Sequence, residues 1–370
     1  MPFTLSENSA LLKPLGLGPA TLANRIFMAP LTRRRAETDG TPSEHAATYY
    51  AQRASAGLII SEATAVAQSA TGAYGNTPGL FTDRQQQRWA GIAEAVHAAG
   101  GAMFVQLWHV GRMAHPDLSG AETVGPSPVA AALTAQTPNG REPLPVPRAL
   151  RTEELAGIVE DFRAAARRAV DAGLDGVEIH AANGYLLHQF LSDVTNRRTD
   201  GYGGPAANRA RLAAEVVEAV AAEIGGHRVG LRISPGHGAG DMREIDEVGV
   251  YESLVCRLKS LNLAYLHVLI EPSQPAFAAV RTIWEGPLVL NTPREVDTDF
   301  EMLENLADWG VISAVAAGRA FLANPDLVER LRSGAALNEP DPATFYTPGP
   351  VGYIDYPALA QVRPLSALGI

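Results

Sequence analysis

Residues 176–191 read GVEIHAANGYLLHQFL, and this stretch decides the fold. Its first residues are mostly apolar, which indicates a buried strand. The polar residues His180, Asn183 and Tyr185 follow, and the last part repeats apolar residues at helical spacing. A strand that ends in polar side chains and then enters a helix is typical of the catalytic face of an α/β barrel. His188 continues the helix and is expected to be structural.

The same unit of a buried strand and a helix recurs along the chain. Strands are predicted at residues 25–32, 58–63, 103–108, 176–181, 229–233, 265–270, 287–291 and 312–317. Helices are predicted at 43–56, from Asp83 onwards, and at 152–173, 206–224, 248–261, 276–282, 299–309 and 318–332. Eight such units close a parallel barrel, whereas a doubly wound open sheet, the alternative, rarely reaches eight without a break in topology. We therefore predict an α/β fold, a single (β/α)8 TIM barrel domain over residues 1–370.

Three segments lie outside the eight units. Residues 9–24 place proline and glycine between apolar residues, which predicts a short hairpin that plugs one end of the barrel. Residues 110–151 are rich in proline, and loops of this length are usually functional or form a subdomain, so we predict a cap over the strand ends. Residues 335–370 form a C-terminal tail. Among the helix starts, Ser43, Asp83 and Thr152 are the predicted N-caps.

Composition excludes several classes of function. Hydrophobic residues make up 46% of the chain, which is enough for a full core, and the net charge of −10 argues against nucleic acid as a partner. The single cysteine, Cys256, predicts neither a disulfide nor a cysteine-based metal site, and no metal is expected. Residues 1–10 lack the pattern of a signal peptide, and no stretch approaches the roughly 20 apolar residues of a membrane span. We expect a cytoplasmic protein with no membrane partner.

The predicted active site is the set of polar residues at the carboxyl ends of the strands. It contains Thr32, Ser61, Gln106, Trp108, His109, His180, Asn183, Tyr185, Arg232, Asn291 and Arg319. The set lacks a carboxylate pair, metal-ligand spacing and a lysine, which argues against a glycosidase, a metal hydrolase and a Schiff-base aldolase. Its neutral donors and two arginines suit an anionic cofactor and a carbonyl oxygen that has to be polarised.

A phosphate site is predicted at the last strand. Residues 316–319 read AAGR and bring a glycine and a cation to the start of a helix. A phosphate site after strands seven and eight recurs in these barrels, and Asn291 ends strand seven in position to join it. The chain has neither a Rossmann fingerprint nor a P-loop, so the phosphate is assigned to a mononucleotide such as FMN.

Six motifs, spread over nearly the whole chain, resemble those of the Old Yellow Enzyme family of FMN-dependent ene-reductases. The similarity covers about residues 10–360 and extends to the bacterial branch with N-ethylmaleimide, pentaerythritol tetranitrate and morphinone reductases. Residues 291–297 are longer than the usual family loop. The motifs are MAPLTR (28–33), SEAT (61–64), VQLWHVGR (105–112), HAANGY (180–185), NRRTDGYGG (196–204) and GRAFLANPD (318–326).

The resemblance implies a role for each site residue. FMN lies across the barrel mouth and is bound by Ala29, Pro30, Leu31, Thr32, Ala63, Gln106, Arg232, Asn291, Gly318 and Arg319. Within that set, Thr32 and Gln106 contact the ring, Arg232 stabilises the reduced flavin, and Gly318 and Arg319 hold the phosphate. The substrate oxygen is bound by His180 and Asn183, and the proton comes from Tyr185. The pocket over the flavin is shaped by Tyr74, Trp108 and Tyr353.

The predicted function is reduction of activated C=C bonds in α,β-unsaturated carbonyl or nitro compounds, with NADPH or NADH as reductant and ping-pong kinetics. Expected substrates are an enone, a maleimide, a nitro compound or a nitrate ester, and the expected assembly is a monomer or a homodimer. Two alternatives are kept. One is a phosphate-handling barrel isomerase or lyase without flavin, and the other is a non-catalytic flavin- or ligand-binding protein.

Overall fold

Eight parallel strands form a closed barrel, in the order β10-β11-β12-β13-β14-β3-β4-β5. The computed structural model describes residues 3–18, 20–293 and 298–359. The closed order confirms the predicted TIM barrel and rules out the open sheet. The strands are β3 (Ile26–Met28), β4 (Ile59–Ala65), β5 (Met103–Trp108), β10 (Gly176–Ala181), β11 (Val229–Ile233), β12 (Tyr265–Leu269), β13 (Leu288–Asn291) and β14 (Ala314–Ala317).

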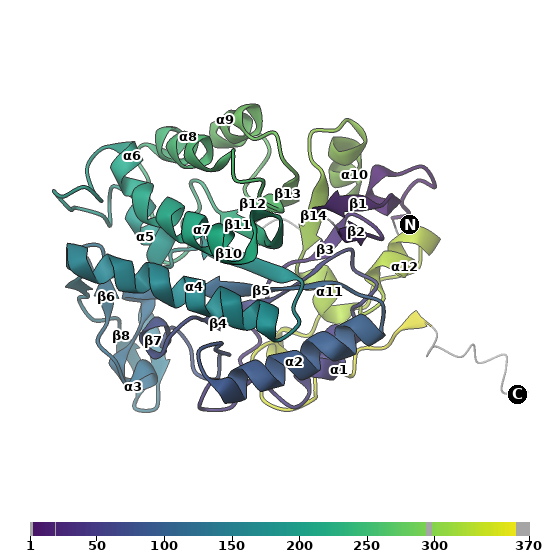
Figure 1. The fold of residues 1–370 in the computed structure, drawn as a ribbon. Coiled ribbons are helices and arrows are strands. Elements are labelled where there is room, and N and C mark those ends of the chain that lie inside the picture. Colours follow the sequence, from purple (N-terminus) through teal and green to yellow (C-terminus); the bar gives the residue numbers. More distant parts are fainter. Residues whose placement is uncertain (1–2, 19, 294–297, 360–370) are drawn as a thin grey trace, which may run out of the picture.

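Helices surround the barrel on its outer side (Figure 1). Their apolar residues recur at helical spacing, as when α4 buries Leu155, Ile158, Phe162 and Ala166. Among the described residues, no helix combines the length and the apolar run needed to cross a membrane. The helices are α1 (Ala46–Ala51), α2 (Asp83–Ala98), α4 (Leu155–Asp171), α5 (Leu186–Leu191), α6 (Ala206–Arg209), α7 (Arg211–Ile224), α8 (Glu247–Leu258), α9 (Pro275–Ile283), α10 (Phe300–Asp308), α11 (Arg319–Ala323) and α12 (Leu327–Ser333).

Three helix starts differ from the prediction. α1 begins at Ala46, with His45 rather than Ser43 in the N-cap position. Thr82 rather than Asp83 caps α2, because its hydroxyl accepts from the Gln85 N–H while the Gln85 side chain bonds back to Thr82. Thr152 begins a 3₁₀ turn ahead of α4, and its hydroxyl donates to Asp200 at 2.6 Å. The sequence predicts each helix start to within a few residues, and the hydrogen bonds of the fold decide which side chain caps the helix.

The lower half of the barrel interior is apolar. Inward side chains near the amino ends of the strands, including Phe27, Phe104 and Tyr265, form one cluster. Leu17 of β1 (Leu15–Leu17) and Leu22 of β2 (Ala20–Leu22) pack into the same cluster. The antiparallel β1–β2 hairpin therefore plugs the amino end of the barrel, as predicted. This packing supplies stability at the end that carries no chemistry.

Residues 110–151 form a small substructure of their own. It contains α3 (Pro116–Ser119), a parallel pair of β6 (Val124–Gly125) and β9 (Arg148–Ala149), and a hairpin of β7 (Thr134–Thr137) and β8 (Gly140–Pro143). Figure 1 shows it on the opposite side of the barrel from the β1–β2 hairpin. The substructure is joined to the β11–α8 loop by the Arg112 guanidinium, which donates to the carbonyls of Ala130, Gly240 and Asp241.

The C-terminal tail is attached to the loop that follows β3. Arg35 donates to the Thr344 and Val351 carbonyls at 2.9 and 2.8 Å, and Arg33 donates to the Gly352 carbonyl at 2.6 Å. Tail residues 360–370 lie outside the described residues. Because residues 29–32 precede these arginines directly, the tail braces one of the loops at the barrel mouth.

The first residue of β10 should tolerate no side chain. A Cβ on Gly176 would lie 2.3 Å from the Arg228 carbonyl oxygen and 2.6 Å from Phe104 Cζ. We therefore expect Gly176→Ala to lower the free energy of unfolding by about 1–3 kcal/mol through overpacking. Urea-induced unfolding followed by circular dichroism measures this change.

Gly157→Ala is the matched control, because its Cβ would meet nothing within 4 Å on α4. Alanine there should raise the free energy of unfolding by about 0.5 kcal/mol, since glycine is the poorer helix former. Equal effects of the two substitutions would contradict the packing argument at the start of β10.

Candidate active site

The end of β10 and the turn after it carry three of the predicted site residues, His180, Asn183 and Tyr185. Asn183 has a φ of 56° and Gly184 a φ of 83°, so two successive residues are left-handed. Asparagine and glycine tolerate this conformation better than other residues. The Asn183 N–H donates to Ser234 Oγ, just past β11, at 2.9 Å. The turn reverses the chain so that Tyr185 becomes the N-cap residue of α5.

Four predicted site residues form one aromatic cluster. The Tyr185 ring lies edge-on to Trp108 at 4.5 Å and to His180 at 5.0 Å between centroids. Trp108 and His180 are nearly parallel at 6.4 Å, and Tyr74 stacks on Trp108 at 6.5 Å. Tyr74 is 39% exposed, whereas Trp108, His180 and Tyr185 are buried. The cluster thus reaches from the barrel end to the surface.

His180 is held as a neutral imidazole. Burial, and then the charge of Arg232, lower the pKa of His180 well below its ordinary value. His180 Nδ1 and Trp108 Nε1 are both buried, and neither atom has a hydrogen-bond partner among the described residues. Buried polar atoms are normally paired, so these two leave hydrogen-bonding capacity for a ligand.

A buried carboxylate lies one inward position below His180. Glu178 is fully buried, accepts from Gln106 Nε2 at 2.7 Å and bonds His267 Nδ1 at 2.8 Å. Burial raises the pKa of Glu178, but His267, Arg232 and Gln106 outweigh that effect and hold the pKa below its ordinary value. Burial lowers the pKa of His267, which fits a neutral ring donating to an ionised carboxylate. Glu178, Gln106 and His267 therefore form a charged, mutually hydrogen-bonded layer below His180, which is the floor of the site.

Arg232 belongs to a chain of hydrogen bonds that crosses three strands. Arg232 Nη2 donates to Asn291 Oδ1 at 2.8 Å, and Asn291 Nδ2 donates to the Ala316 carbonyl at 2.9 Å. These contacts join β11, β13 and β14 at their carboxyl ends. Residues 294–297 of the predicted phosphate loop lie outside the described residues.

The remaining predicted cofactor residues lie at neighbouring strand ends. A Cβ on Gly318 would meet Leu31 Cδ2 at 3.2 Å, which leaves a narrow cradle between the ends of β14 and β3. Ala63 of β4 pairs in register with Gln106 of β5. Arg319 opens α11 and is exposed. The loop that follows β3 contributes Ala29, which is buried, and Pro30 and Thr32, which are half-buried.

Tyr353 lies in a different cluster from the other predicted pocket residues. Its ring is fully buried and stacks on Tyr49 at 4.0 Å, with the Arg35 and Arg33 guanidiniums 4.6 and 5.2 Å from its centroid. It therefore supports the loop after β3 from behind. Its predicted contact with the substrate stays a prediction.

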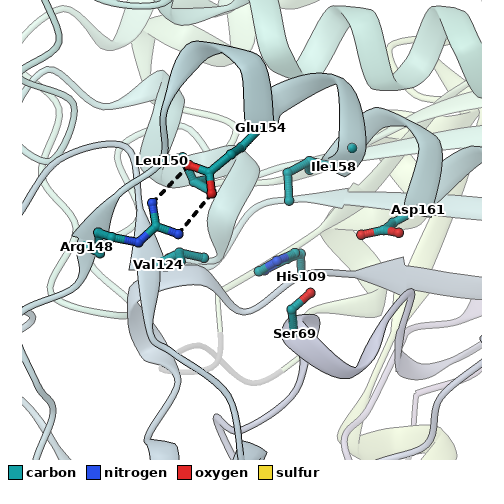
Figure 2. A pocket seen from close by; sticks show the side chains of 9 residues that line it. Ser69, His109, Val124, Arg148, Leu150, Glu154, Ile158 and Asp161 are labelled. Atoms are coloured by element: carbon teal, nitrogen blue, oxygen red, sulfur yellow. Dashed lines mark hydrogen bonds and ion pairs between the residues drawn. The ribbon is translucent and has the colours of Figure 1, made fainter.

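His109 faces a pocket outside the barrel. Figure 2 shows its ring beside Ser69, with Asp161 of α4 on the far side and the Arg148–Glu154 pair at the rim. The pocket has a volume of about 250 Å³ and shares no lining residue with the aromatic cluster. Burial lowers the pKa of His109 to about 4. The sequence placed His109 with the strand-end residues, and the structure assigns it to the outer wall of the barrel.

Two buried polar residues below His180 are not among the residues predicted for the site. Glu178 and His267 both interrupt otherwise apolar strands at positions that alternation turns inward. A polar residue in the middle of a barrel strand is the signal that could have found them. Their pairing could not have been derived, because it depends on the register of three strands.

The chain matches known flavin enzymes over almost its whole length. Residues 10–338 match the family described as NADH:flavin oxidoreductase / NADH oxidase. The chain is 42% identical to 12-oxophytodienoate reductase 1 of Oryza sativa subsp. japonica, over 95% of this chain and 94% of that protein. It is 41% identical to a probable flavin mononucleotide-dependent alkene reductase of Leishmania infantum, over 94% and 97%.

Solved structures show the same architecture. Morphinone reductase superposes with a TM-score of 0.90 at 44% identity, covering 97% of this chain and 99% of that one. The Old Yellow Enzyme homologue of Zymomonas mobilis superposes with a TM-score of 0.90 at 42% identity, covering 94% and 99%. Both the sequence and the fold therefore agree with the resemblance seen in the motifs.

The buried His109 should make the fold sensitive to acid. Its ordinary pKa of 6.5 applies to the unfolded chain, whereas the folded value is about 4. Between these values the unfolded chain binds more protons, so the free energy of unfolding falls as the pH falls from about 6.5 to 4, by up to about 3 kcal/mol. His109→Asn keeps an acceptor for the Gly111 N–H and should flatten this slope. An unchanged pH slope in urea unfolding would contradict the assignment.

Proposed function

The chain belongs to the NADH:flavin oxidoreductase / NADH oxidase family, which includes the Old Yellow Enzymes, and we propose from this that it is an FMN-dependent ene-reductase. The proposed reaction adds two hydrogens across a C=C bond conjugated to a carbonyl or nitro group, at the expense of NADPH or NADH. The observation that supports it best is the cluster of His180, Tyr185 and Trp108 above a bonded polar floor.

The residues at the barrel mouth fit FMN. A ring system with a phosphate needs polar groups at its edge, a cation and a close approach to the backbone. Gln106 and Arg232, held in place by Glu178 and Asn291, supply the polar group and the cation, and the Gly318 cradle allows the close approach. We assign the ring to Thr32, Gln106 and Arg232 and the phosphate to Gly318 and Arg319. The remaining proposed contacts are Ala29, Pro30, Leu31, Ala63 and Asn291. Bound FMN supplies the hydride-transfer chemistry.

His180 and Asn183 bind the oxygen of the substrate. When hydride adds to the β-carbon of an enone, negative charge builds on the carbonyl oxygen, and two aimed donors stabilise it as an oxyanion hole does. The neutral state of His180 suits this role, since a neutral imidazole donates without losing its proton to the product. The left-handed Asn183 places the second donor two residues past the end of β10.

Tyr185 delivers the proton to the α-carbon. The carbon of a nascent enolate is strongly basic, so a phenol is a sufficient acid. The ring is held edge-on by Trp108 and His180, which fixes the direction of its hydroxyl. Burial of the cluster excludes water, and Tyr74 closes its outer side. The nicotinamide and the substrate use the same pocket in turn, which gives ping-pong kinetics.

The proposal includes the substrate class and the setting of the enzyme. Enones, maleimides, nitro compounds and nitrate esters all offer an oxygen to the His180–Asn183 pair. The assembly proposed is a monomer or a homodimer. A cytoplasmic location agrees with a single cysteine, Cys256, in a chain of 370 residues.

The purified protein should carry FMN and turn over an enone. NADPH or NADH should bleach its visible flavin spectrum under anaerobic conditions, and 2-cyclohexenone should restore the spectrum. A colourless protein that cannot be reconstituted with FMN would support the isomerase or lyase instead. Bleaching that no enone, maleimide or nitro compound reverses would leave a flavin-binding protein without ene-reductase activity.

Removing the Tyr185 hydroxyl should separate the two half-reactions. We expect Tyr185→Phe to slow reoxidation by 2-cyclohexenone by about 100-fold or more, the usual contribution of a general acid, with little change in reduction by the nicotinamide. Stopped-flow absorbance measures each half-reaction. Tyr74→Phe, which removes a hydroxyl at the edge of the cluster, is the matched control. Equal slowing of both half-reactions in Tyr185→Phe would refute the acid role.

A further inference from the structure

A second histidine lies behind the turn that carries Asn183, one of the two proposed substrate donors. His188 of α5 is fully buried, and its Nδ1 accepts from the Gly184 N–H at 2.9 Å. Its Nε2 lies 3.2 Å from Oε1 of Glu244, a residue of the β11–α8 loop. Because Nδ1 accepts a hydrogen bond, the ring hydrogen is on Nε2 and points at the carboxylate. The backbone of the turn is thereby linked to a buried charge.

Glu244 is surrounded by donors. Besides His188, the carboxylate accepts from the Tyr251 hydroxyl at 2.8 Å and from the Gly236 N–H at 2.8 Å. Burial raises the pKa of Glu244, but His188 and these donors outweigh burial and keep the pKa below its ordinary value. A buried carboxylate with three donors is fixed in orientation, so it in turn fixes the ring of His188.

The β11–α8 loop also touches the turn directly. A Cβ on Gly184 would meet the Ala239 carbonyl oxygen at 2.6 Å and Gly240 Cα at 2.8 Å. Ser234, at the start of the loop, accepts from the Asn183 N–H at 2.9 Å. The turn is therefore contacted by Ser234 at Asn183, by His188 at Gly184, and by the backbone of residues 239–240 of the loop.

We propose that the His188–Glu244 pair is a positioning element that sets the backbone of Asn183 and Gly184, and through it the aim of the Asn183 donor at the substrate oxygen. The inference rests on the proposed function, since it assigns a support to the donor named there. His188 and Glu244 contact neither substrate nor cofactor in this account. Their effect reaches the reaction through the left-handed turn, whose φ values leave little freedom once Gly184 N–H is bonded.

The test is phenol binding by the FMN-loaded enzyme, because a phenolate oxygen on a flat ring resembles the charge that develops on the substrate. Glu244→Gln cannot match all three donors, and His188→Leu removes the acceptor for Gly184. Each should raise the Kd of p-hydroxybenzaldehyde, measured by visible titration, by about ten-fold, the size expected for a buried donor left unpaired. His188→Asn keeps an acceptor near Nδ1 and should recover part of the affinity.

Two controls separate positioning from general destabilisation. His97→Asn breaks another histidine–carboxylate pair, to Asp175 at 2.9 Å, immediately before β10 at the amino end of the barrel. It should leave the Kd unchanged, and because its side chains are 41% and 35% exposed it controls for the loss of a histidine–carboxylate pair, while the melting temperature of each variant reports lost stability. In an Asn183→Ala background, Glu244→Gln should change the Kd by less than about two-fold, because the donor it positions is gone.

Two results would overturn the proposal. One is an unchanged Kd in both Glu244→Gln and His188→Leu, and the other is the same rise in the Asn183→Ala background as in the wild type. If either occurs while Asn183→Ala itself weakens phenol binding, the donor role stands and only the positioning fails. If Asn183→Ala leaves phenol binding unchanged, the proposed function of the donor fails, and the positioning inference fails with it.

Discussion

The ionised carboxylate of Glu178 is the constraint on which the upper half of the barrel depends. A charge in a closed barrel costs several kcal/mol unless it is paired and hydrogen-bonded. Gln106 and His267 bond it directly, and Arg232 adds a compensating charge. These residues come from β5, β12 and β11, so satisfying one carboxylate fixes the register of four strands. Trp108 and His180 occupy the next inward positions above Gln106 and Glu178, and their placement follows from the floor.

The two ends of the barrel interior differ in their role: the amino end stabilises the fold and the carboxyl end holds the site residues. Its amino end is apolar and is closed by the β1–β2 hairpin, and its carboxyl end is polar and leaves His180 Nδ1 and Trp108 Nε1 without partners among the described residues. Unpaired buried atoms lower stability by about 1–3 kcal/mol each, and a ligand that bonds them recovers this cost.

The fold could be predicted from local pattern, and the supports of the site could not. Eight buried strands alternate with helices in the sequence, and only one closed topology suits that number. His180, Asn183 and Tyr185 were found because they are adjacent in the chain. Glu178 is not among the predicted site residues, and His188 is predicted only as a structural residue of its helix. Their partners come from distant strands and loops, which only barrel closure brings together.

We infer that the end of β10 and the turn after it, through His180 and Asn183, present two donors to a single oxygen above the flavin. A crystal structure of the FMN-loaded protein with p-hydroxybenzaldehyde tests it most directly. The phenol oxygen should lie at hydrogen-bond distance, about 3 Å, from side-chain nitrogens of both His180 and Asn183. A phenol oxygen that contacts neither residue, with FMN in place, would contradict the account.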